Sequence, residues 1–337
     1  MKRKNQSASY VRVVACLLFV IFTVRVAFAQ EKKIVRMVFV SLAWNSELPF
    51  RAALARGFFK SQGIQIEPIL IRGGPAAIAA LVSGEVDFAS IGGAQAVFRG
   101  KARGLDLTIV GCISSTTNYI LLGTKQTRTV EDLKGKTIGI TGAGTYSEFA
   151  VKAFLKKNNI NPEKDVMLRA IGGTVLRAAA IEKGMIAAAP FSTEDAVRLI
   201  RAGYSVISNM NESLGIPQNI IVTRNEVLDK FPETSKRVLK AYIQGIQLAK
   251  FNKKEAIKAG YDSGLHGDAD VVSAAWDLYA PGLTPDLSIA VPGIQQMLDE
   301  DIRSGFVDKN FTVDRVINDR VLKIAQQELR AEGKLKP

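Results

Sequence analysis

Residues 64–90, IQIEPILIRGGPAAIAALVSGEVDFAS, and residues 165–191, DVMLRAIGGTVLRAAAIEKGMIAAAPF, share one order of elements. Each begins with an apolar strand pattern, which a Gly-Gly pair interrupts before an alanine-rich helical pattern. A single glycine, Gly84 or Gly184, follows each helix and precedes a second apolar strand. The two stretches share this layout but little sequence identity, which indicates a structural repeat.

A strand and a helix are also predicted ahead of each stretch. Residues 35–41 and 137–141 have strand patterns, and residues 49–62 and 146–158 have helical ones. Strands that alternate with helices are typical of parallel sheets covered by helices. We therefore expect an α/β protein with two lobes, each a mainly parallel sheet flanked by helices. A chain of 337 residues also favours two domains over one core.

The last third of the chain is almost entirely helical in pattern, and we expect it to pack on lobe one. Strand-like segments at 119–124 and 219–223 are the predicted hinge crossings between the lobes. Lobe one should then comprise residues 30–118 and 224–337, and lobe two residues 119–223. The predicted helices of the tail are 232–252, 254–261, 268–278, 289–304 and 312–331.

Residues 1–29 have the pattern of an export signal. A basic start precedes an apolar run of residues 13–24, and Ala27-Phe28-Ala29 suits a signal peptidase. The run is shorter than the roughly 20 residues that span a bilayer, so we predict cleavage after Ala29 and a periplasmic product. Retention as a membrane anchor is the alternative. Removing residues 1–29 takes away five basic and no acidic residues, which lowers the net charge from +13 to +8.

Several kinds of chemistry are poorly supported by the sequence. His266 is the only histidine, which excludes a multi-histidine metal site, and Cys112 lies in a predicted buried strand. Gly135-Lys136-Thr137 lacks the earlier glycine of a phosphate-binding loop, and residues 142–147 lack the third glycine of a dinucleotide fingerprint. Basic residues are not clustered with aromatic ones. We expect no metal, no cofactor, no nucleic-acid partner and no catalytic residue.

Polar or glycine-rich loops follow five of the predicted strands, at 42–47, 91–95, 114–118, 142–147 and 190–195. Ligands of open α/β sheets bind in the crevice at the carboxyl ends of the strands. Some of these loops also begin helices, where free N–H groups suit an anion. The candidate ligand-binding residues are Trp44, Asn45, Gly93, Ala94, Ser115, Thr116, Thr145, Tyr146, Ser192 and Glu194.

The candidate residues suggest different contacts with a ligand. Trp44 follows a strand in a polar turn, so that its ring could either stack on a planar ligand or belong to the core. Asn45 and Glu194 are candidate partners for an amine or a hydroxyl group. The mildly basic charge suits an anionic ligand or an anionic membrane surface, but a generally basic surface explains it better than either.

Three motifs resemble the nitrate/sulfonate/taurine group of ABC transporter substrate-binding proteins, which also includes binders of pyrimidine precursors of thiamine. They are ARGFFK at 55–60, ALVSGEVD at 80–87 and DLKGKTIG at 132–139. The resemblance implies a type II periplasmic-binding fold that closes on its ligand by hinge motion. Its implied partners are a permease and an ATPase at the inner membrane. Met185-Ile186-Ala187 departs from the group's Gly-x-x-Asp ending, and we expect this change to lie near the cleft.

The sequence thus predicts a monomeric, extracytoplasmic protein that captures a small anionic or aromatic molecule, and the resemblance implies that it is the solute-binding component of an ABC importer. One alternative is an enzyme on the same fold, as in pyrimidine-precursor biosynthesis. The single histidine and single mature cysteine leave few groups for proton transfer, which argues against it. Another alternative is an exported ligand sensor for a signalling receptor. The sequence does not distinguish a sensor from a transport component.

Overall fold

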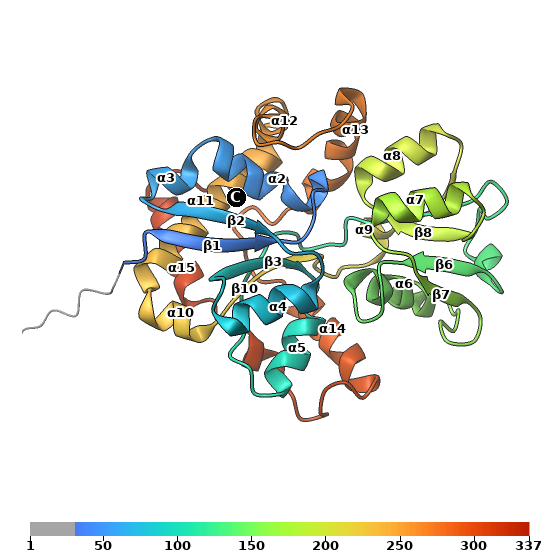
Figure 1. Cartoon of the computed structure of the whole chain (residues 1–337), viewed down its shortest axis with the longest axis horizontal. Helices are drawn as coiled ribbons and strands as arrows, with labels where there is room; N and C mark the ends of the chain where they lie inside the picture. Colours follow the sequence, from blue (N-terminus) through green and yellow to red (C-terminus); the bar gives the residue numbers. More distant parts are fainter. Residues whose placement is uncertain (1–30, 337) are drawn as a thin grey trace, which may run out of the picture.

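The computed structural model describes residues 31–336, so the predicted signal and its cleavage after Ala29 lie outside the described residues. Two five-stranded sheets lie in separate lobes, one blue to teal with the orange and red tail, the other green to yellow (Figure 1). None of the helices in residues 31–336 combines the length and hydrophobicity that a membrane span requires.

The sheet of lobe one has the strand order β2-β1-β3-β10-β4. β1, β2 and β3 are parallel, whereas β10 runs antiparallel to both β3 and β4. Four strands therefore share one direction, as expected of a mainly parallel sheet. Its strands are β1 (Ile34–Phe39), β2 (Gln65–Leu70), β3 (Phe88–Gly92), β4 (Thr108–Cys112) and β10 (Asn219–Thr223).

The sheet of lobe two repeats this arrangement with the order β7-β6-β8-β5-β9. Here β5 is the single antiparallel strand, paired with β8 and β9. The predicted α/β fold with two mainly parallel sheets is confirmed, and the two sheets have equivalent topology. The strands are β5 (Ile120–Gly123), β6 (Thr137–Ile140), β7 (Met167–Ala170), β8 (Ala188–Phe191) and β9 (Ser205–Asn209).

The chain passes between the lobes twice, through residues 113–119 after β4 and residues 210–218 after β9. The segments predicted as crossings, 119–124 and 219–223, contain the antiparallel strands that begin immediately after these connections. β10 lies in the sheet of lobe one, so residues 219–223 belong there and not at the end of lobe two. A strand that enters its sheet from the opposite lobe is antiparallel to its neighbours, which explains the direction of β5 and β10.

Helix α2 (Trp44–Ala55) begins earlier than the sequence predicts. Pro49 suggested a helix start, because proline is favoured in the first turn, and residues 42–47 were expected to form a loop. Instead Pro49 lies inside α2, and the buried side chains of Trp44 and Leu48 hold an additional turn before it. The predicted helix also ends early, and Gly57, with φ of 66°, separates α2 from α3 (Phe58–Ser61).

The remaining helices of the two repeats flank the sheets (Figure 1), and those that follow the Gly-Gly pairs lie where the sequence predicts them. In each repeat one helix follows the Gly-Gly pair, and the next one follows the central strand of the sheet. These helices are α4 (Gly74–Ser83), α5 (Gln95–Ala102), α6 (Tyr146–Lys157), α7 (Thr174–Glu182) and α8 (Thr193–Arg201), with the short α9 (Met210–Ser213) in the second connection.

The helical tail packs mainly on lobe one, where α11 lies against α2, α3 and α15, while α13 also packs against α8 of lobe two. The prediction of one helix over 312–331 is wrong. Ile317 instead forms a β-bridge to Ile109, which interrupts the helical pattern before α15. The tail contains α10 (Asn225–Lys230), α11 (Pro232–Phe251), α12 (Lys253–Asp262), α13 (Ala269–Tyr279), α14 (Val291–Arg303) and α15 (Arg320–Ala331).

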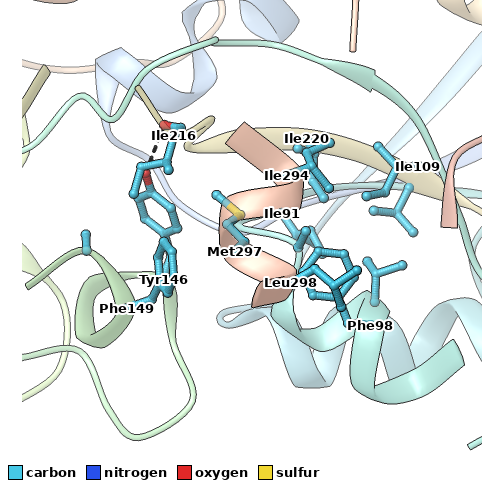
Figure 2. Close-up of a cluster of buried hydrophobic side chains, with 14 of the residues drawn as sticks. Ile91, Phe98, Ile109, Tyr146, Phe149, Ile216, Ile220, Ile294, Met297 and Leu298 are labelled. Carbon is cyan, nitrogen blue, oxygen red and sulfur yellow. Dashed lines mark hydrogen bonds between the residues drawn. The ribbon is translucent and has the colours of Figure 1, made fainter. Parts of the chain in front are cut away.

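One hydrophobic cluster continues from lobe one into lobe two. Figure 2 shows Met297 and Leu298 of α14 lying beside Ile91 of lobe one, with Tyr146 of lobe two on the other side. Ile216, in the second connection, accepts a hydrogen bond at its carbonyl from the Tyr146 hydroxyl. The tail and one connection therefore support the contact between the lobes.

The close packing of α11 on α2 yields the first prediction. A methyl group added at Gly245 would lie 2.2 Å from the Pro49 carbonyl oxygen and 2.8 Å from Ala53 Cβ. Alanine gains up to about 1 kcal/mol of helix propensity over glycine, but overpacking costs about 1–3 kcal/mol. Gly245→Ala should therefore lower the free energy of unfolding in urea denaturation. Gly215→Ala, whose added methyl meets no atom within 4 Å, is the control and should change it little.

Candidate functional site

The segments that follow the carboxyl ends of the parallel strands meet where the two lobes touch. The Trp44 amide of lobe one donates a hydrogen bond of 2.8 Å to the Glu194 carboxylate of lobe two. Gly93 of lobe one lies against Tyr146 of lobe two. We call this contact region the lobe interface, and it contains the starts of α2, α5, α6 and α8.

Glu194 supplies to α2 the cap that its own lobe lacks. Ala43, at the N-cap position, has no side chain that can accept from the first turn. The Glu194 carboxylate accepts the Trp44 N–H instead, and its negative charge suits the positive end of the helix dipole. The residue is partly exposed, but its carboxyl group is enclosed, and this burial raises its pKa to about 7 despite the hydrogen bonds from its own backbone and from Trp44.

The Trp44 ring lies in the core of lobe one. Its indole N–H donates to the His266 carbonyl over 2.9 Å, and its ring contacts Tyr261 edge-on at a centroid distance of 5.0 Å. A methyl group added at Gly260 would lie 2.3 Å from the ring. Of the two roles considered for this residue, the core role matches the placement of its ring. Only its backbone amide reaches lobe two, and His266 itself is exposed in a loop.

Gly93 is required where α5 approaches lobe two. Its φ is 72°, its amide donates to the Gln218 carbonyl over 2.7 Å, and an added Cβ would lie 2.8 Å from Tyr146 Cδ2. A side chain at this position would force the lobes apart. Ala94 next to it is the N-cap of α5, and the Nε2 amide of Gln95 is buried without a partner among the described residues.

Residues of the first connection lie between α2 and the tail. Asn45 Nδ2 donates to the Asn118 carbonyl at 3.4 Å, and the Ser115 amide donates to the Gly282 carbonyl at 3.1 Å. The Thr116 hydroxyl and the side-chain amide of Asn118 are buried without partners within residues 31–336. Burying such groups unpaired costs about 1–3 kcal/mol each, so they are available to bind a polar ligand.

The predicted hydroxyl groups of lobe two make local bonds instead of capping their helices. Thr145 Oγ1 donates to the Gly142 carbonyl at 2.7 Å, and Ser192 Oγ donates to Asp195 Oδ2 at 3.0 Å. The starts of α6 and α8 consequently have no side-chain cap. The Tyr146 ring lies 5.9 Å from that of Tyr119, which places two aromatic groups at the edge of the interface.

Arg177 is a functional candidate that the sequence analysis missed. It is buried in α7, with Nε donating to the Pro190 carbonyl at 3.0 Å and Nη1 to both Thr141 Oγ1 and the Gly172 carbonyl at 2.7 Å. These bonds tie together the carboxyl ends of three strands, and burial lowers the pKa of the guanidinium group. A charged residue on the same helix face as Ala178 and Ile181 was the available signal.

Glu47 is the second missed candidate. Its side chain is buried, and neither carboxyl oxygen has a partner among the described residues. Burial raises its pKa to about 8, although the charge of Arg51 acts in the opposite direction. Glu47 is therefore protonated at neutral pH. It was missed because residues 42–47 were expected to form a loop, whereas the early start of α2 turns Glu47 inward.

Comparisons with known proteins identify the fold. The model of the NMT1/THI5-like family matches residues 44–256. No curated protein matches the chain by sequence. Similar solved structures include a protein of Bordetella bronchiseptica RB50, with 22% identity, a TM-score of 0.72 and coverage of 89% of this chain and 98% of that one.

Two further structures have named ligands. The alkanesulfonate-binding protein SsuA of Xanthomonas axonopodis pv. citri, bound to MOPS, is 19% identical with a TM-score of 0.70, covering 86% of this chain and 99% of that one. The nitrate-binding protein NrtA of Synechocystis PCC 6803 is 15% identical with a TM-score of 0.71, covering 91% of both chains. The expected periplasmic-binding fold is thereby confirmed.

The placement of the Trp44 ring generates the second prediction. Trp44→Ala should lower the free energy of unfolding by about 3–5 kcal/mol, because it removes a fully buried aromatic group. Trp44→Phe, which keeps most of the buried apolar surface, is the matched control and should cost less. Chemical denaturation measures both. A Trp44→Ala protein with unchanged stability would show that the ring does not belong to the core.

Proposed function

Because the chain belongs to the NMT1/THI5-like family, we propose that it captures a small organic molecule between its lobes for an ABC importer. The observation that carries this proposal is the pair of equivalent sheets joined by only two connections, with helix starts of both lobes meeting at the interface, none of them capped by the side chain of its own N-cap residue. Two connections form a natural hinge. SsuA and NrtA, which bind an alkanesulfonate and nitrate, have the same fold.

We propose that the ligand has an anionic group. The starts of α5, α6 and α8 supply N–H groups and positive dipole ends without side-chain caps, and the start of α2 is capped only by Glu194 of the other lobe. Glu194 already places a carboxylate at one of these starts, so an anionic ligand would take its place. The contacts would come from the backbone of Trp44, Gly93 and Ala94, and from the side chains of Asn45, Ser115, Thr116, Thr145, Tyr146 and Ser192.

The aromatic pair Tyr119 and Tyr146 supports a ligand with a planar or apolar part. The rings are tilted by 36° at a distance of 5.9 Å, and Tyr119 remains partly exposed. These two tyrosine rings can stack on a planar ring of the ligand or cover its alkyl chain. This protein would act in the periplasm as a monomer, after removal of residues 1–29, and would deliver its ligand to a permease and an ATPase at the inner membrane.

An enzyme on the same fold is the second candidate, and one observation favours it. Glu47 and Glu194 have pKa values raised to about 8 and 7, the range in which a carboxyl group can exchange protons at neutral pH. Raised pKa values also arise from burial alone, and the Glu47 side chain, on α2, is fully buried. Binding without turnover is therefore the simpler proposal.

Mass spectrometry of the small molecule that remains bound through purification tests the proposed function. We expect one compound per protein molecule, recovered unchanged, and a more compact protein in small-angle scattering when it is added back. Thermal-shift screening of nitrate, alkanesulfonates, carboxylates and pyrimidines would identify the anion that binds best, and this anion would be used in the affinity measurements. A product formed from the bound compound would replace the transport proposal with the enzymatic one.

The pKa of Glu194 leads to a pH prediction. Above about pH 7 its carboxylate is charged and repels an anion at α2, whereas below this pH it is neutral. The affinity for the best anion of the screen should therefore fall about tenfold from pH 6 to pH 8, a difference of about 1.4 kcal/mol. Isothermal titration calorimetry of the wild type and of Glu194→Gln provides the comparison, and the variant should show little pH dependence.

The matched control is Glu182→Gln, because Glu182 belongs to the same lobe and its exposed carboxylate lies 3.6 Å from Arg198. This variant should keep the wild-type pH dependence.

The direction of the Glu194 pKa shift can also be checked without ligand, from the pH dependence of the protein's stability. A raised pKa means that the folded protein retains a proton that the unfolded chain loses, so stability should fall as the pH rises from about 4.5 to 7. An affinity for anions that increases with pH would contradict the role given to Glu194.

A further inference from the structure

The two lobes correspond position by position at the amino ends of their central strands, opposite to the lobe interface. The Asp87 amide donates to the Arg36 carbonyl over 2.9 Å, and the Ala187 amide donates to the Thr137 carbonyl over 2.8 Å. Ala187 thus occupies in lobe two the place that Asp87 occupies in lobe one. The departure at residues 185–187 was expected near the cleft, but it lies at the far end of β8.

A second pair of residues follows from the antiparallel strands. Thr223 pairs with Phe88 in lobe one, and Gly123 pairs with Ala188 in lobe two. The residues that come next in the chain, Arg224 and Thr124, therefore correspond as well. Both positions differ in the same way, because lobe one has a charged side chain where lobe two has a small one.

In lobe one these charged side chains fill the end of the sheet. The buried Asp87 carboxylate accepts from the Arg36 amide at 3.0 Å and from Lys32 Nζ at 2.6 Å. The Arg224 guanidinium donates to the carbonyl of Val86 at 3.1 Å and to the carbonyl of Leu81. A carboxylate and a guanidinium thus bind backbone groups at this end of the sheet.

In lobe two the same place is a cavity of about 400 Å³, lined among others by Thr124, Lys136, Thr137, Ile186 and Ala187. The glycines after the equivalent helices show the difference. A Cβ at Gly84 would lie 3.9 Å from the Arg224 guanidinium, whereas a Cβ at Gly184 would meet no atom within 4 Å. The backbone surroundings are conserved between the lobes, and the two charged groups are absent from this one.

We propose that this cavity binds a small guanidino acid, such as free arginine, whose guanidinium and carboxylate groups take the places of those missing side chains. The guanidinium corresponds to that of Arg224 and donates to the Ile186 carbonyl. The carboxylate corresponds to that of Asp87, accepts from the Thr137 amide and pairs with the Lys136 ammonium group. The site is separate from the lobe interface, so it does not depend on the transport proposal.

Calorimetry and thermal shift with L-arginine test the proposal, with citrulline as the matched ligand that lacks the positive charge. We expect saturable binding of arginine in the millimolar range, and binding at least tenfold weaker for citrulline. Equal responses to the two compounds, or no response to arginine, would overturn the proposal.

Protein variants locate the site. Thr124→Arg combined with Ala187→Asp rebuilds the arrangement of lobe one and should abolish arginine binding, while the protein keeps its circular dichroism and its anion binding at the lobe interface. Lys136→Ala should weaken arginine binding about tenfold, and Lys183→Ala, an exposed lysine of the same lobe outside the cavity, should not. Arginine binding that survives in the double variant would place the site elsewhere and reject this assignment.

Discussion

The exchange of one strand between the lobes is the constraint on which the rest of the structure depends. β10 is buried between β3 and β4 of lobe one, and β5 is buried between β8 and β9 of lobe two. Each strand enters its sheet directly after crossing from the other lobe. Both connections must therefore run along the carboxyl ends of the parallel strands, which is also where the helices begin. The position of the lobe interface follows from this topology before any side chain is considered.

The stability of the lobe interface depends on the hydrogen bonds that the Glu194 carboxylate receives there. Moving a carboxylate out of water is expensive unless hydrogen bonds compensate, and here the Trp44 amide and the Thr193 hydroxyl provide them. The pKa of about 7 shows that compensation is incomplete. In the proposed binding mode, a ligand anion takes the place of this carboxylate at the start of α2.

Much of the fold could be predicted because local signals and tertiary structure agree. The Gly-Gly pairs, the strand patterns and the helical tail all correspond to observed elements. The start of α2 could not be predicted, since Pro49 indicates a later start and only the burial of Trp44 and Leu48 favours the earlier one. The placement of β10 depended on sheet order, which no local pattern contains.

The sequence indicates which loops meet at the lobe interface, but not which atoms of each residue make the contacts there. Gly93 and Tyr146 meet across the interface, as expected of residues from two facing strand ends. Trp44 contributes its amide and not its ring, a distinction that depends on Gly260 and Tyr261, more than 200 residues further along the chain.

The same repeat that positions the interface also makes the opposite ends of the lobes comparable. Backbone hydrogen bonds of the two sheets match there, so differences between the lobes can be assigned to individual side chains. In lobe one the side chains of Asp87 and Arg224 bind backbone groups at this end of the sheet. In lobe two the equivalent residues, Ala187 and Thr124, have no charged side chain that could make these contacts. This difference at two matching positions is the reason for proposing a ligand that carries both a guanidinium and a carboxylate.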